Sequence, residues 1–129
     1  MGQPAAKQGD QVIATDMHLI QPPGPSSPIL VPHPFTGIID GSLSSDVNIQ
    51  SMPAATLQST ATNTPPHVPI GGSFVKPPTN QATIITGSGT VFINNKPAAR
   101  SGDTALTCND PVDLPVGTVV AVSTVLIGG

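Results

Sequence analysis

Short apolar runs rich in valine, isoleucine and threonine recur along the chain, separated by clusters of glycine, proline and asparagine. Such runs predict brief β-strands, because β-branched side chains suit a pleated surface and the flanking residues form turns. We predict strands at residues 11–13, 17–20, 35–39, 46–49, 57–62, 71–76, 83–85, 90–93, 104–107 and 118–127. Glutamate is absent and strong helix formers are sparse, so no helix is predicted. The chain is expected to be all-β.

Two proline-rich segments interrupt this pattern. Residues 21–34 hold six prolines, which fix φ and remove backbone donors, so we expect neither a helix nor a central strand there. The apolar residues 29–31 and Phe35 favour an ordered loop on the body of the protein over a free linker. Residues 63–69 are expected to form a second loop, which carries His67.

One phrase occurs three times along the chain. It reads Pro-Ala-Ala-Arg-Ser-Gly-Asp at residues 97–103 and Pro-Ala-Ala-Lys-Gln-Gly-Asp at residues 4–10, and a partial copy starts at Pro53. Val-x-Ile precedes the second and third copies at residues 47–49 and 91–93, and the same Val-x-Ile stands at residues 125–127. Repetition at this spacing indicates one supersecondary unit used several times.

The ends of the chain complete the first repeat when they are joined. We predict three units, formed by residues 125–129 with 1–20, by residues 45–67 and by residues 89–111. A unit shared between the two termini predicts a closed, pseudo-threefold arrangement.

The residues from Gly87 to Asp103, GSGTVFINNKPAARSGD, resemble the PAAR-repeat proteins, which cap the spikes of type VI secretion systems and related contractile injection machines. The three repeats extend the resemblance over the whole chain. The middle copy departs from the motif, with Thr56 in place of the basic residue and Gln58-Ser59 in place of Gly-Asp. The resemblance implies a small cone of short strands that sits on a trimeric spike of the valine-glycine repeat type.

Composition limits the alternatives. The 129 residues suffice for a single domain over 1–129, and four basic against seven acidic residues offer no electrostatic footprint for nucleic acid or anionic lipid. No apolar stretch approaches the roughly 20 residues that span a bilayer, and no signal peptide is recognised, so we expect assembly in the cytoplasm. With three phenylalanines and neither tryptophan nor tyrosine, the usual large core anchors are missing.

The candidate chemistry rests on His18, His33, His67 and Cys108, the only imidazoles and the only thiol. Three nitrogens and one sulfur match a closed tetrahedral zinc site, although their dispersed spacing is a weak signal. His18 lies fourteen residues after Pro4 and His67 fourteen after Pro53, while the third unit has Pro111 at that position, three residues after Cys108. The alternative is three loop histidines and a small buried cysteine.

The resemblance favours the metal, because PAAR tips are similar in binding one near the vertex through three histidines and a cysteine. Structural Zn²⁺ would then replace the missing aromatic core. Asp16, Asp110 and Asp113 stand close in sequence to these residues and are candidates to orient an imidazole.

Three functions remain open. A structural cap would pair its strand edges at residues 47–49, 91–93 and 125–127 with a trimeric spike, meet the target membrane transiently and carry any effector cargo bound separately. A zinc hydrolase would need a general base, and with no glutamate and no fourth histidine none is evident. A disordered proline-rich adaptor is the third alternative. We predict the cap, without enzymatic activity, on a secreted or extracellular injection particle.

Overall fold

The computed structural model describes residues 2–129, so Met1, which belongs to the first predicted repeat, lies outside the described residues. Across the described range the chain is all-β, as predicted, with strands joined by turns and loops. No helix within residues 2–129 is long and apolar enough to cross a bilayer. This ordered β structure does not fit the disordered adaptor.

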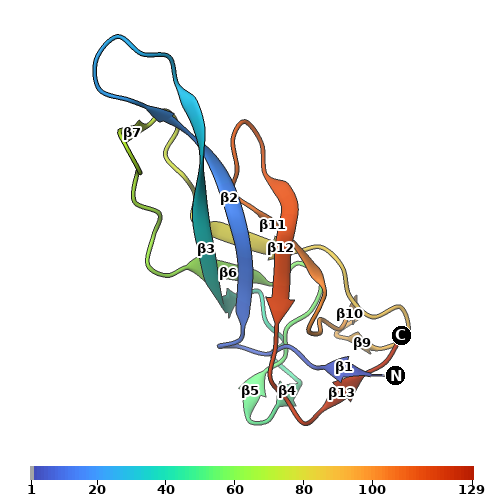
Figure 1. Cartoon of the computed structure of the whole chain (residues 1–129). Coiled ribbons are helices and arrows are strands. Elements are labelled where there is room, and N and C mark those ends of the chain that lie inside the picture. Colours follow the sequence, from blue (N-terminus) through green and yellow to red (C-terminus); the bar gives the residue numbers. More distant parts are fainter. Residues whose placement is uncertain (1) are drawn as a thin grey trace.

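The body of the molecule is an antiparallel sheet that closes on itself. In order around the sheet, its strands are β12 (Leu114–Val120), β11 (Thr104–Thr107), β8 (Gln81–Ile84), β6 (Thr60–Asn63), β3 (Ile29–Gly41) and β2 (Gln11–Gln21). Thr118 of β12 lies opposite Ile13 of β2, and this pairing closes the ring. The short β7 (Ser73–Phe74) extends the far end of β2. Figure 1 shows the β2–β3 hairpin rising well beyond the other strands, and we call its turn, residues 22–28, the apical end.

Three two-stranded hairpins lie at the opposite end, which we call the base (Figure 1). They are β4 (Asn48–Ile49) with β5 (Met52–Pro53), β9 (Phe92–Ile93) with β10 (Lys96–Pro97), and β13 (Leu126–Ile127) with β1 (Gln3–Pro4). The isoleucines occupy equivalent positions, since Ile49 lies opposite Met52, Ile93 opposite Lys96 and Ile127 opposite Gln3. The third hairpin is thus built from both ends of the chain.

Backbone hydrogen bonds link the three copies of the Pro-Ala-Ala phrase in a closed circle, the alanine ring (Ala6, Ala55 and Ala99). The amide of Ala6 donates to Ala99 at 3.0 Å, that of Ala55 to Ala6 at 3.0 Å, and that of Ala99 to Ala55 at 3.1 Å. All three side chains are buried. Larger side chains would overfill this position, which explains why the repeated phrase carries alanine.

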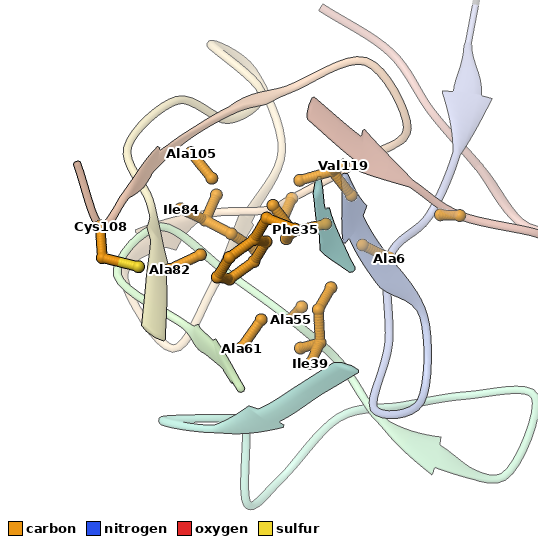
Figure 2. Packing of buried hydrophobic residues seen from close by; sticks show 13 residues of the cluster. Ala6, Phe35, Ile39, Ala55, Ala61, Ala82, Ile84, Ala105, Cys108 and Val119 are labelled. Atoms are coloured by element: carbon orange, nitrogen blue, oxygen red, sulfur yellow. The ribbon is translucent and has the colours of Figure 1, made fainter. Parts of the chain in front are cut away.

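The interior of the closed sheet is filled mainly by small residues around one aromatic ring. Figure 2 shows Phe35 at the centre, with Ile39, Ile84 and Val119 nearby, alanines around them and Cys108 at the margin. Inward positions alternate along β2 and β3, as expected for strands with one buried face.

The main difference from the sequence prediction concerns residues 21–34. A loop without a central strand was expected there, but β3 begins at Ile29 and includes Pro32 and Pro34. These prolines lie opposite Met17 and Thr15 of β2, in a stretch of β3 that has no second strand partner within residues 2–129. Proline is tolerated along such an edge, because no neighbouring strand requires its missing donor.

Most other strand bounds shift by a few residues, and two of the differences change how the strands are connected. The expected strands at 11–13 and 17–20 form the single strand β2, because the residues between them also pair with β3. The run expected at 118–127 is divided into β12, which ends at Val120, and β13, which starts at Leu126. The break lets the chain leave the closed sheet and join the base.

Candidate metal centre

The structure brings the three predicted histidines together from separate segments and places Cys108 beside His18. The donor atoms that converge most closely belong to His18, His67, Cys108 and Asp16, and His33 is not part of that group. His18 lies on β2, His33 on β3, His67 in the loop after β6, and Cys108 directly after β11. His18 and His33 occupy inward positions in the alternation of their strands and are each 1% exposed. The polar positions thus follow the apolar core residues on the same inner faces.

The imidazole rings stand against one another. The ring centres of His18 and His67 are 4.9 Å apart, and the centre of His33 lies 5.5 Å from His18 and 5.6 Å from His67. Phe74 packs against His18 and His33, and Phe35 packs against His67. Two of the three phenylalanines of the chain therefore shield this cluster from water.

Sulfur, nitrogen and oxygen donor atoms converge within this cluster. Single donor atoms of Asp16, His18, His67 and Cys108 all lie within 4.8 Å of one another. The Cys108 Sγ is 3.8 Å from His18 Nε2 and 3.4 Å from Asp16 Oδ2, while His67 Nε2 is 2.9 Å from the same Asp16 oxygen. The sequence predicted Asp16 as a candidate to orient an imidazole, and the structure places its carboxylate against the imidazole of His67.

Two histidine nitrogens of the cluster are buried without a hydrogen-bond partner, namely His18 Nδ1 and His33 Nε2. In His33 the other nitrogen, Nδ1, lies 2.8 Å from the carbonyl oxygen of Val31, which can only accept. Nδ1 is therefore the donor, and in the neutral ring Nε2 carries the lone pair. In His18, Nδ1 is 3.4 Å from Asp110 Oδ2, and this contact does not meet hydrogen-bond geometry. Buried polar atoms rarely stay unpaired, and a bound cation would satisfy the His33 nitrogen.

Burial shifts the pKa of two groups in the cluster, Cys108 and His18. It raises the pKa of the Cys108 thiol to about 11, and the adjacent Asp16 carboxylate adds to the effect. Burial also lowers the pKa of His18 below its usual value and outweighs Asp110, which acts in the opposite direction. At neutral pH, His18 is thus a neutral donor and Cys108 a thiol that must lose its proton to bind a metal.

These residues fit a metal ion. Imidazole nitrogen and thiolate sulfur are ligands that Zn²⁺ accepts, and the cluster offers both, together with a carboxylate, in a site screened by aromatic rings. The structure thus holds a candidate metal-binding cluster. The identity of the ion, and the choice of His18, His33, His67 and Cys108 as its ligands, stay predictions.

Comparison with known families gives a match over most of the chain. The model of the PAAR motif family matches residues 30–113 and again residues 76–129. No curated protein matches the chain. The two matches together span well over half of the sequence and include the Pro-Ala-Ala-Arg phrase at residues 97–100 and the segment that carries His33, His67 and Cys108. This family supports a spike-tip role in contractile injection systems. The chain belongs to the PAAR motif family.

Proposed function

We propose that the protein is the cap of a trimeric spike in a contractile injection system, with the base as its docking face. The observation that carries the proposal is the set of three hairpins of matching register, held together by the alanine ring. A trimeric spike ends in three equivalent strand edges. A single chain that offers three similar hairpins on one face meets all three edges at once, in pseudo-threefold fashion.

The outer edges of the hairpins suit this partner. Each hairpin is a separate two-stranded sheet, so the outer edges of both its strands have no strand partner within residues 2–129. Phe92 and Leu126 occupy equivalent positions and are 57% and 61% exposed. Unpaired strand edges beside exposed apolar side chains favour docking by strand addition. The proposed partner is a spike of the valine-glycine repeat type, in accord with the family.

The metal centre lies away from the base and would serve the cap structurally. We assign Zn²⁺ to His18, His33, His67 and Cys108, which join β2, β3, the loop after β6 and the segment after β11. A closed site of three nitrogens and a thiolate leaves no position for a reacting water. The zinc would join the strands that lead to the apical end, where large apolar side chains are scarce.

The cellular setting follows from this role. The cap would assemble on its spike in the cytoplasm and travel at the tip of the particle to the target membrane. Effector cargo, where present, would be a separate partner that the cap links to the spike. A catalytic function finds less support, because a site filled by three histidines and a thiolate leaves no place for a zinc-bound water to react.

Binding to a soluble trimeric spike of the valine-glycine repeat type tests the docking face. The double variant Phe92→Arg and Leu126→Arg should weaken binding at least about tenfold, because charges would be buried against an apolar surface. Val68→Arg is the matched control, since Val68 is 71% exposed but lies in the loop beside the metal cluster, and it should bind as the parent does. Parent-like binding by the double variant would refute docking through the base.

A further inference from the structure

We propose that Asp16 belongs to the metal centre. Its negative charge, together with that of the Cys108 thiolate, balances the charge of a divalent cation. The inference rests on the metal centre proposed above and adds a fifth residue to it. Asp16 is not one of the four predicted ligands. Its role is to fix the neighbouring donors and supply charge.

The position of the carboxylate supports this role. Asp16 is fully buried, at 0% exposure, and its Oδ2 atom contacts both His67 Nε2, at 2.9 Å, and Cys108 Sγ, at 3.4 Å. Its Oδ1 atom accepts hydrogen bonds from Thr107 Oγ1, at 2.5 Å, and Asn109 Nδ2, at 3.4 Å. The carboxylate is therefore held from one side and turned toward two metal-binding side chains on the other. Carboxylates placed in this way orient histidine ligands and increase their basicity.

The charge of Asp16 has no permanent counterpart in the protein. No lysine or arginine of residues 2–129 lies within 4.0 Å of its carboxylate, and its one ion-pair contact is with His67. Asp103, also buried, differs in this respect, because Arg100 Nη2 lies 3.3 Å from it. A buried carboxylate without a cation is costly, whereas a thiolate and a carboxylate together match the charge of a divalent ion.

The unpaired nitrogens argue that the cluster is a binding site and not a closed hydrogen-bond network. His33 Nε2 and His18 Nδ1 have no hydrogen-bond partner, although both side chains are 1% exposed. If Asp16 served only the fold, its network would be expected to include these neighbouring polar atoms as well. A cation bound among these donors would compensate the charge of the Asp16 carboxylate and would also bind the free nitrogen of His33.

The isosteric variant Asp16→Asn separates the two roles. Zinc affinity, measured by competition with a chromophoric chelator, should fall by about 10- to 100-fold. With Co²⁺ as the probe, the near-ultraviolet thiolate band should persist, because Cys108 remains a ligand and the site is weakened but not dismantled. After complete removal of metal, the variant should melt at the same temperature as the metal-free parent or higher, because it no longer buries an uncompensated charge.

Asp103→Asn is the matched control. It breaks a buried ion pair away from the metal cluster, so it should lower the melting temperature equally with and without zinc and leave zinc affinity unchanged. Our proposal for Asp16 is overturned if Asp16→Asn binds zinc as tightly as the parent, or if the metal-free variant melts lower or fails to fold where the parent folds. A parent protein that takes up no stoichiometric zinc would instead refute the metal centre, and spike binding is measured independently of both.

Discussion

At the scale of single residues, the inner face of β2 changes from apolar to polar side chains, and the polar ones form the candidate metal centre. The inward positions of β2 include Val12, Asp16, His18 and Ile20, and these four are buried. A small domain that places polar residues in its interior loses apolar burial that it needs for stability. A bound cation offsets that loss, so the same residues that weaken the metal-free core would stabilise the metal-bound protein.

The protonation of Cys108 predicts how metal uptake depends on pH. Because burial raises the pKa of the thiol to about 11, the metal-free protein holds this proton at neutral pH, and zinc must displace it. Zinc affinity should therefore increase with pH, by about tenfold per unit between pH 7 and 8, where the lowered pKa of His18 keeps that ligand neutral. Chelator competition at several pH values measures this slope.

The variant Cys108→Ser provides the control, since a serine hydroxyl does not ionise in this range and binds zinc poorly. It should bind zinc far more weakly and with a much flatter pH dependence. A parent protein whose zinc affinity is independent of pH would show that Cys108 does not bind the metal as a thiolate.

Part of this cluster could be predicted from the sequence. His18 and His67 stand out because each lies fourteen residues after the proline of a repeat, and Cys108 because it is the only thiol. His33 has no equivalent in the repeats, and only the pairing of β2 with β3 places it beside His18. Asp16 was a candidate to orient an imidazole only because it lies two residues before His18. Its contacts with His67 and Cys108 could not be predicted, because those residues come from distant segments.

At the scale of elements, local patterns predicted the type of structure better than its extent. The strand expected at residues 104–107 is present with those bounds, and the Val-x-Ile segments do enter the base hairpins. Pro32 and Pro34 led to the wrong prediction of a loop, because proline is excluded from central strands but is tolerated on an edge. Whether a stretch of strand becomes an edge depends on long-range pairing, which no local pattern records.

The alanine ring gives a prediction at this scale. Ala99 is fully buried, and its amide and carbonyl join it to Ala55 and Ala6. Ala99→Leu should lower the free energy of unfolding by about 1–3 kcal/mol, because the extra methyl groups force the three segments apart. Urea unfolding of the zinc-loaded protein measures the change.

Val122→Leu is a suitable control for this substitution, since Val122 is 77% exposed and has room for a larger side chain. Its effect should stay within about 0.5 kcal/mol. If Ala99→Leu were equally mild, the ring would tolerate larger residues, and the repeated alanines would need an explanation other than close packing.

At the scale of the whole molecule, two different devices hold the two ends. Backbone hydrogen bonds of the alanine ring close the base, whereas two side-chain acceptors and one backbone hydrogen bond join β2 to the segment after β11 near the cluster. There the amide of Met17 donates to Asn109 Oδ1 at 2.7 Å, that of Leu19 to Asp110 Oδ2 at 2.8 Å, and that of Asp110 to the carbonyl of Met17 at 2.8 Å. The sequence repeats account for the first device but give no indication of the second.

Removal of the metal should therefore loosen one end and spare the other. The amides of Met17, Leu19 and Asp110 should exchange with solvent at least about tenfold faster after chelation, since the segments they join are then held by hydrogen bonds alone. The amides of the alanine ring should keep their rates, because their bonds do not involve the cluster. Hydrogen exchange followed by NMR resolves both groups in one experiment. Equal acceleration at both ends would mean that the metal stabilises the fold as one cooperative unit. The prediction that the base stays closed without metal would then be wrong.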